Sequence, residues 1–371
     1  MRKHGIINSF AQRGMSVREG WVYILNPDNC HTFCHTFGDQ AQRAICYSIQ
    51  IQDYSRFLRI EEQDQLSLND GVAMKKILKR IMIFVGGLIA LILFVVAGLY
   101  LRAEARFNRT YTIQVEPIAV VSNADSLAIG RHWAEVHCQS CHGEDLGGGP
   151  FFEDPALGYV DAPNLTSGTG GIGNSYTDAD WIRAIRHGVM PNGKSVFLMP
   201  SNDFYYANDQ ALAGMIAYMK TLPPVDRETR SRSLTPLGKV LFQLGVLGEL
   251  LRAETIPHNV RPSAPPEGVT VEYGEYLANA HGCKACHASN LAGGQPPEPG
   301  APFAHNLTPG GELIGWDEAD FFTAMRDGRT PSGRQLSDAM PWKGLGNLTD
   351  DELRAIWLYL QTQPALPTNE R

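Results

Sequence analysis

The chain has 371 residues, which at about 150 residues per domain predicts two or three domains. Its 43% hydrophobic content is that of a globular protein rather than a disordered chain or a coiled coil. The formal net charge of −7, with no stretch of Lys and Arg clustered as needed to follow a phosphate backbone, argues against nucleic-acid binding. Seven cysteines are too few for a disulfide scaffold and odd in number, so their spacing is the informative feature.

The N-terminal part of the chain shows no sustained helical or strand periodicity over residues 1–73. This part precedes Met74-Lys75-Lys76, which has the form of a basic start ahead of an apolar segment. We therefore expect Met74 to be the true initiator and residues 1–73 to be a misassigned extension. N-terminal sequencing of the native protein tests this expectation.

An uncharged run of 21 residues follows at 81–101, long enough to cross about 30 Å of hydrocarbon as a helix. Four basic residues precede the run closely and three follow it, so the positive-inside bias does not orient it. A cleaved secretory signal has a shorter apolar core, although Ala103-Glu104-Ala105 has the form of a cleavage site. We expect an uncleaved transmembrane helix at 81–101.

Beyond the apolar run, one sequence pattern occurs twice. Cys138-Gln139-Ser140-Cys141-His142 corresponds to Cys283-Lys284-Ala285-Cys286-His287, and an Asn-Leu-Thr triplet follows each at 164 and 306. Further matching pairs are separated by 140 or 141 residues: Asp180/Asp320, Arg186/Arg326, Lys194/Arg334, Met199/Met340 and Tyr218/Tyr359. The repeat predicts two domains, at 124–224 and 268–371, joined by a linker at 225–267.

Each copy is expected to consist of helices joined by long Gly- and Pro-rich loops. Gly130 and Gly274 are expected to open helices leading to the cysteine motifs, and Thr177 and Thr349 have the form of helix caps before apolar stripes. We find no convincing alternating strand pattern in either copy. A unit of about 100 residues with so much loop would need a large buried cofactor to complete its core.

The Cys-x-x-Cys-His spacing is that of a c-type haem attachment site. Two cysteines with two residues between them hold the porphyrin through thioethers, and the next residue places its imidazole beneath the iron. Cys138, Cys141, Cys283 and Cys286 are the predicted attachment residues, and His142 and His287 the iron ligands. A zinc or redox site is the alternative, but zinc would need a further cysteine pair unless both copies shared one metal. Cys30 and Cys34-His35 form a near match that is one residue too long.

The sixth position of each iron needs another ligand. Candidates that follow His142 are Met190, Met199, His187, Met215 and Met219. Met199 has a methionine counterpart in Met340, whereas Met190 corresponds to Thr330 and His187 to Asp327. Met215 and Met219 lie on an apolar helix stripe typical of a core. We therefore predict Met199 and Met340, and methionine ligation makes both haems relatively oxidising carriers.

Four cations repeat in register and are candidates to bind haem propionates, with solvated surface charge as the alternative. These are Arg186, Arg326, Lys194 and Arg334. Four further histidines do not repeat as ligands and are expected on the surface or in packing contacts: His132, His137, His281 and His305. The aromatic residues Trp133, Trp181, Trp316, Phe321, Trp342 and Trp357 are expected in the core, with haem contact as the alternative.

The linker is enriched in Pro and Arg, and Thr235-Pro236 has the form of a helix start before a stripe of leucines. This stripe could contact lipid, a partner subunit or the two domains of its own chain, and we expect the last.

On its two motifs, Pro163-Asn164-Leu165-Thr166, Gly171-Ile172-Gly173 and Met199-Pro200, the chain resembles bacterial membrane-anchored dihaem cytochromes c over 125–371. It is similar to the cytochrome subunits of membrane-bound alcohol-type dehydrogenases. The resemblance implies helical cytochrome c domains that pass electrons toward quinone or an oxidase. Those subunits typically carry three haem motifs, whereas this chain has two, and its second copy has His305 where the first has Pro163.

The sequence thus predicts an all-α protein with one transmembrane helix, two tandem cytochrome c domains and two covalently bound haem c groups. Because thioether attachment occurs outside the bacterial cytoplasm, we expect a single-pass inner-membrane protein whose haem domains face the periplasm. Residues 124–224 carry 5 Lys and Arg against 11 Asp and Glu, and residues 268–371 carry 7 against 13, so each domain has a net charge of −6. Such domains should dock on basic surfaces.

The expected role is electron transfer between a dehydrogenase or respiratory complex and a downstream redox protein. The alternative is a haem enzyme, such as a dihaem peroxidase or a thiol-oxidising cytochrome. Two filled methionine positions argue against an open iron.

Overall fold

The computed structural model describes residues 54–296 and 301–370, together with four short strands nearer the N-terminus. Side chains are described from Met74 onward. The four strands pair in chain order as an antiparallel sheet, which the sequence did not predict: β1 (Met15–Arg18), β2 (Trp21–Leu25), β3 (His31–Thr36) and β4 (Ala44–Ile49). Cys30 lies outside the described residues, and whether Met74 is the initiator stays a prediction.

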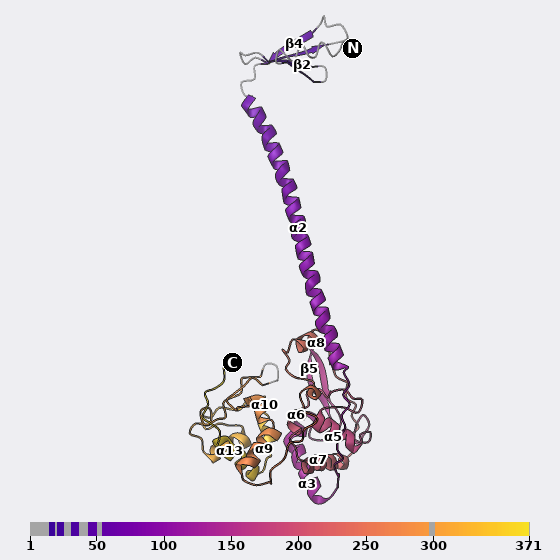
Figure 1. Ribbon diagram of the computed structural model, residues 1–371, viewed down its shortest axis with the longest axis vertical. Coiled ribbons are helices and arrows are strands. Elements are labelled where there is room, and N and C mark those ends of the chain that lie inside the picture. Colours follow the sequence, from indigo (N-terminus) through magenta and orange to yellow (C-terminus); the bar gives the residue numbers. More distant parts are fainter. Residues whose placement is uncertain are drawn as a thin grey trace. The chain divides into compact units, whose positions relative to one another are not determined.

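Contacts divide the chain into two units, Met1–Leu91 and Ile92–Arg371. Helix α2 (Tyr54–Phe107) begins in the first unit and ends in the second (Figure 1). Its part Met74–Phe107 is long and apolar enough to cross a membrane, and none of its most apolar window is buried. The expected helix at 81–101 is therefore confirmed, as a candidate membrane span.

The second unit contains two helical modules of the same design. In the first module, α3 (Ala124–Trp133) continues through a π-helical turn (Ala134–Cys138) into α4 (Gln139–His142) and packs across α7 (Asp209–Thr221). In the second, α9 (Val271–Ala280) precedes α10 (Cys283–His287) and packs across α13 (Asp350–Gln361). Each module adds one longer and one short helix: α5 (Asp178–His187) and α6 (Ser201–Phe204), then α11 (Glu318–Asp327) and α12 (Trp342–Leu345).

The repeated glycines have a packing role rather than the predicted role of opening their helices. Helices α3 and α9 begin several residues before Gly130 and Gly274, at caps formed by Asn123 and Thr270. A Cβ on Gly130 would lie 2.0 Å from the backbone oxygen of Gly214, and one on Gly274 would lie 1.9 Å from that of Ala355. A glycine is therefore required in each module where the first and last helices cross.

The expectation of no strand in the repeat is wrong for the first module. Strands β5 (Gly149–Asp154) and β6 (Gly158–Ala162) form an antiparallel hairpin, and β7 (Ser233–Leu234) from the linker pairs with β6. The inward positions of β6 are Gly158, Val160 and Ala162. Because two of these are small, the alternation in burial is weak in side-chain hydropathy, and the pattern escaped notice.

The linker helix α8 (Pro236–Gln243) starts at the predicted cap Thr235 but is shorter than the leucine stripe. The expectation that it covers the gap between the two modules is wrong, because it packs against the end of α2. Phe242 packs against Phe107 of α2, with ring centroids 4.9 Å apart, in a cluster that also holds Ala103, Leu247 and Leu251. The linker therefore joins the first module to the end of α2.

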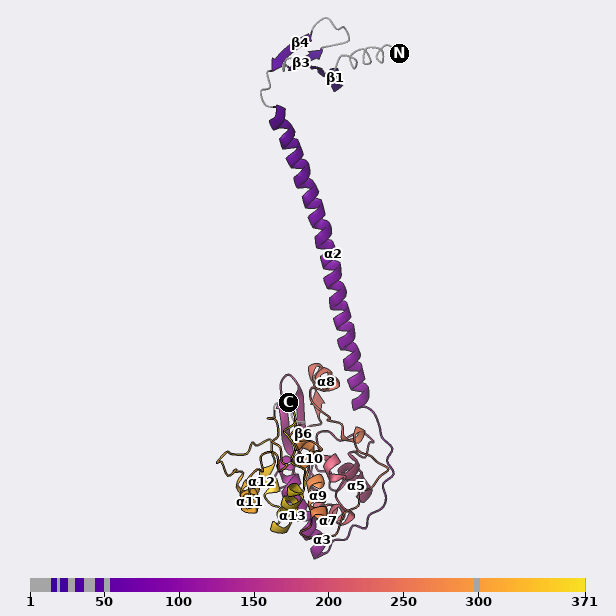
Figure 2. The same ribbon diagram turned by 60° about the vertical axis from the view of Figure 1, so that its left-hand side comes forward.

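The two modules pack side by side in a reciprocal way (Figures 1 and 2). The carboxylate of Asp203, in α6, lies against Gly282 just before α10. In the opposite direction, Gly344 in α12 lies against the backbone oxygen of Val136, and the amide of Asn347 donates to the backbone oxygen of Glu135 at 3.2 Å. Each short helix after a Met-Pro pair thus contacts the segment that leads into the other module's Cys-x-x-Cys-His motif.

Candidate haem sites

The first motif lies where the π-helical turn meets α4, and His142 is buried at the end of α4. Its Nδ1 is 2.8 Å from the carbonyl oxygen of Pro163. Since a carbonyl only accepts, Nδ1 donates the proton and Nε2 keeps its lone pair, as a metal-binding imidazole requires. Burial lowers the pKa of His142, which favours the same neutral form.

The second motif repeats this arrangement on α10. Nδ1 of His287 is 2.6 Å from the carbonyl oxygen of His305. The sequence left open what replaces the proline carbonyl in the second copy, and the structure shows that the backbone of His305 does so. The bond needs only a main-chain oxygen, so the side chain at this position is free to vary and pairs instead with Glu312 at 2.9 Å.

An Asn-Thr pair fixes the loop that carries each of these carbonyls. Buried Asn164 accepts hydrogen bonds from the backbone N–H and the hydroxyl of Thr166 and donates to the carbonyl of Val225 at 2.7 Å. In the second module, Asn306 binds Thr308 in the same way and donates to the carbonyl of Leu366 at 2.8 Å. The triplets therefore connect the loop after each motif to the segment after the last helix of the module.

A cavity of about 690 Å³ lies in the first module and is lined by both cysteines of the motif and by His142. This volume is within the range of cofactor sites. The indole of Trp181 also lines the cavity, and its buried Nε1 has no hydrogen-bond partner among the described residues. A buried donor without a partner is costly, so a polar group of a bound molecule would complete the site. The volume, the cysteine pair, the oriented imidazole and this indole all fit a haem.

Four methionines line the same cavity. Met215 and Met219 are also buried in the core of α7, as the sequence predicted. Met190 and Met199 are both half-buried on loops. After Met199 and Met340 the backbone is the same, with ψ of 55° at Pro200 and 46° at Pro341 and a short helix following each. Met190, opposite Thr330, has no such counterpart.

His187, the remaining candidate iron ligand, lies away from the cavity. Its Nδ1 lies 3.2 Å from Nδ1 of His258, and it is outside the set of described residues that line the cavity.

The repeated cations divide into two kinds. Buried Arg186 forms an ion pair with Asp209 at 2.9 Å, and Arg326 forms one with Asp350 at 2.8 Å, at the start of the last helix of each module. Lys194 lines the first cavity and donates to Asn108 at 2.8 Å. Arg186 and Arg326 therefore have the same packing role, each in its own module, which the sequence did not suggest. Arg334 forms a separate ion pair with Glu312 at 2.6 Å.

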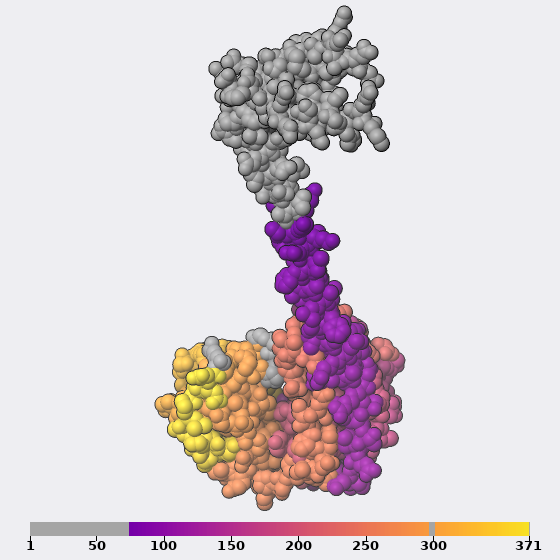
Figure 3. All heavy atoms as spheres, turned by 45° about the horizontal axis from the view of Figure 1, so that its top comes forward, coloured from indigo at the N-terminus to yellow at the C-terminus, as the bar shows by residue number. Residues whose placement is uncertain are grey.

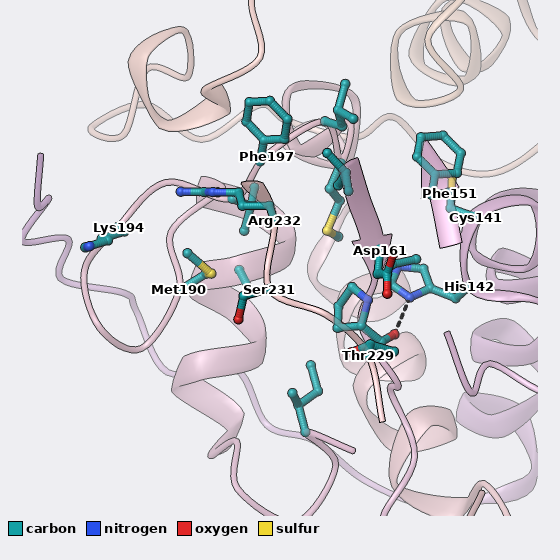
Figure 4. Close-up of a pocket in the computed structure, with 18 of the residues that line it drawn as sticks. Cys141, His142, Phe151, Asp161, Met190, Lys194, Phe197, Thr229, Ser231 and Arg232 are labelled. Carbon is teal, nitrogen blue, oxygen red and sulfur yellow. Dashed lines mark hydrogen bonds between the residues drawn. The ribbon is translucent and has the colours of Figure 1, made fainter. Parts of the chain in front are cut away.

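The linker contributes cavity residues that sequence reasoning missed. Thr229, Ser231 and Arg232 line the cavity, and Figure 4 shows Arg232 across the pocket from His142 in this view, near Met190. The guanidinium of Arg232 donates to the carbonyl of Ser195 at 2.8 Å and lies 5.3 Å from the ring centre of Phe197. The only signal in the sequence was the arginine content of the linker, which does not show that the linker folds back over the site.

The remaining histidines lie in packing contacts or on the surface, as expected. His132 binds Glu352 across the modules at 2.9 Å, and this contact raises the pKa of the imidazole. His137 and His281 are buried against each other at the same interface.

Comparison with known proteins agrees with this geometry. Residues 127–223 match the family model described as cytochrome c, and residues 270–360 match that of cytochrome c oxidase, cbb3-type, subunit III. The chain is also 30% identical, over 257 residues, to a dihaem cytochrome c-type protein of Cereibacter sphaeroides, covering 82% of that protein and 62% of this chain. The chain belongs to the dihaem c-type cytochromes. It accordingly carries two cytochrome c domains and two covalently bound haem c groups.

The cytochrome is also similar to subunits of larger enzymes. It is 27% identical over 286 residues to the cytochrome c subunit of a quinone alcohol dehydrogenase from Gluconacetobacter polyoxogenes, covering 68% of this chain. It is 27% identical over 277 residues to the fructose dehydrogenase cytochrome subunit of Gluconobacter japonicus, covering 67% of this chain. The cytochrome spans 59% and 55% of the length of these two relatives.

Proposed function

We propose that this cytochrome is anchored in the bacterial inner membrane by α2 and carries electrons in the periplasm between a dehydrogenase or respiratory complex and a downstream redox protein. Each bound haem supplies a one-electron iron couple. The protein's part would be to attach the two haems, supply a histidine and a methionine to hold each iron, keep the modules together and present docking surfaces.

The proposed attachment residues are Cys138 and Cys141 in the first domain and Cys283 and Cys286 in the second. His142 and His287 are the proposed proximal ligands, supported by the matching bonds of Nδ1 to Pro163 and His305. Met199 and Met340 are the proposed distal ligands, supported by their place in the repeat and the matching backbone that follows them. Lys194 and Arg232, with the indole of Trp181, are the proposed partners of the first haem's propionates.

The observation that carries this function is the reciprocal packing of the two modules. The segment after each proposed methionine ligand contacts the segment before the other domain's haem motif. The two proposed haem sites therefore share one interface, which suits transfer of an electron from one to the other. Two methionine-filled iron sites also favour a carrier over the alternative of a peroxidase or thiol-oxidising enzyme, which needs an open iron.

A dehydrogenase partner is proposed because several relatives are named as cytochrome subunits of dehydrogenases. The acidic surface of each domain, with a net charge of −6, favours a partner with a basic docking patch. Association should weaken as salt screens these charges.

The function is tested on the full chain purified with detergent from its native membranes. We expect the chain to take up two electrons on reduction, one per haem, and its ferric form to be unreactive toward cyanide and peroxide. Rapid reaction at one haem would favour the enzyme instead. A tagged chain should co-purify with a dehydrogenase whose substrate reduces the bound cytochrome, and this reduction should slow as salt is raised.

Topology is tested separately by protease treatment of intact spheroplasts. Cleavage of the haem domains from outside supports the periplasmic placement, and protection of these domains contradicts it.

A further inference from the structure

Leu237 of α8, with Leu244 and Val246 in the turn that follows the helix, presents an apolar surface that no described residue covers. The side chains of Leu237, Leu244 and Val246 are 50%, 57% and 61% exposed. The opposite side of the helix is buried, with Gly238 against the backbone oxygen of Leu157 and Phe242 in the cluster with α2. The exposed apolar side chains are therefore carried by a helix and a following turn that are themselves well fixed in the fold.

The position of α8 along α2 is set by three contacts. The Lys239 ammonium binds the Glu104 carboxylate at 2.5 Å and lies 5.2 Å from the ring centre of Tyr100. Phe242 packs on Phe107 (Figure 3 shows the linker, in coral, against the purple end of α2). The apolar run of the span ends at Leu101, and a helix rises about 1.5 Å per residue, so these contacts lie within about 10 Å of its end.

The polar layer of a bilayer adds roughly 5–7 Å on each side of the hydrocarbon, so Tyr100 and Glu104 lie at the depth of this layer and Phe107 lies just outside it. We propose that the face formed by Leu237, Leu244 and Val246 inserts into the headgroup layer of the membrane that α2 spans. This inference rests on the proposed membrane anchor. Lipid is the occupant because α8 is attached to the end of the apolar run itself.

The charges beside this face suit the same surface. Arg102, just after the apolar run, and Arg109, just beyond the end of α2, are both exposed, and Lys239 of α8 is paired with Glu104. Arginines at this level bind anionic headgroups, while the apolar side chains enter between them. The lipid contact would hold the first haem domain at a fixed distance from the membrane, where a membrane-bound partner can reach it.

The test is lipid photolabelling of the full haem-containing chain in vesicles of phosphatidylethanolamine and phosphatidylglycerol. A lipid that carries a photoactivated carbene precursor in its upper acyl chain is used, and labelled residues are located by mass spectrometry. We expect label in 81–101 and at Leu237, Leu244 and Val246. Val260, later in the linker, and Ile314, in the second domain, are 64% and 67% exposed and should remain unlabelled.

The outcomes separate the two proposals. Absence of label in 81–101 would contradict the anchor itself. Label in the span, with no more at Leu237, Leu244 and Val246 than at Ile314, would overturn the inference and leave the anchor standing. A crosslinked dimer through α8 in place of lipid labelling would assign the face to a second copy and likewise overturn it.

A variant pair sharpens this test. Leu237→Glu with Leu244→Glu should reduce labelling at Val246 at least threefold, and Ile314→Glu should leave it unchanged. Unchanged haem absorbance in each variant shows that the first domain is intact.

Discussion

His137 and His281 join the two cytochrome domains through a contact of 2.6 Å between Nε2 of the first and Nδ1 of the second. Their rings are nearly parallel, with centroids 4.8 Å apart, and Trp133 stacks on His281. His137 directly precedes Cys138, and His281 lies two residues before Cys283. One side-chain contact therefore connects the two proposed haem attachment segments.

Loss of this contact should weaken the domain interface. In His281→Leu, Nε2 of His137 is left buried without a partner, so we expect the free energy of unfolding to fall by about 1–3 kcal/mol. Chemical denaturation followed by far-UV circular dichroism measures the change. His305→Leu removes a histidine side chain that is 51% exposed and should cost less than about 0.5 kcal/mol. Equal costs in the two variants would show that the His137 contact contributes nothing specific.

The same pair should make stability fall in acid. Burial lowers the pKa of His137 to about 3 and that of His281 well below its usual range. The unfolded chain takes up protons near pH 6.5 and the folded pair does not, so their contribution is complete above about pH 6.5. Below that pH the free energy of unfolding should fall by up to about 1.4 kcal/mol per pH unit for each histidine.

Other groups at the interface change stability in the opposite direction. Glu352 raises the pKa of His132, and burial raises that of Asp203 to about 7, so both favour the folded state in acid. A comparison of variants isolates the pair. Between pH 7 and pH 5, the double variant His137→Leu with His281→Leu should lose less stability than the wild type, and His132→Gln should lose more. A double variant with the wild-type pH dependence would contradict the assignment.

Substitution of either proposed methionine ligand should affect one haem alone. Met199→Leu and Met340→Leu should each remove the methionine-to-iron charge-transfer absorption of one ferric haem and lower the potential of that haem, because thioether ligation stabilises ferrous iron. Met190→Leu is the matched control, since Met190 lines the same cavity but has no counterpart in the repeat. If Met190→Leu abolishes the absorption and Met199→Leu does not, the ligand of the first haem is Met190.

The Asn-Thr networks should determine the stability of their own domains. Asn164→Ala removes the acceptor of the buried Thr166 backbone N–H and the closest donor to the carbonyl of Val225, so we expect a loss of about 2–3 kcal/mol in unfolding free energy. Thermal melts of the ferric protein, with the Soret band as the probe, measure this loss. Asn259→Ala changes an exposed asparagine of the linker and should be nearly neutral. Equal losses would contradict a specific role for the buried network.

Much of the site follows from the sequence because covalent attachment is a local requirement. The spacing of Cys138, Cys141 and His142 places all three groups on about one helical turn, whatever surrounds it. The repeat then separates Met199 from Met190 by correspondence with Met340. The apolar run at 81–101 likewise predicts its own helix, since length and hydropathy are properties of that segment alone.

The tertiary structure decided what depends on distant partners. Arg186 binds Asp209 because α5 packs beside α7, and Arg232 reaches the cavity because the linker folds back, neither of which has a local signature. The hairpin β5–β6 was not predicted because two of the three inward residues of β6, Gly158 and Ala162, are small and give little alternation in hydropathy. The contact of His137 with His281 exists only because two domains dock, and the energy of docking comes from surface that neither copy buries alone.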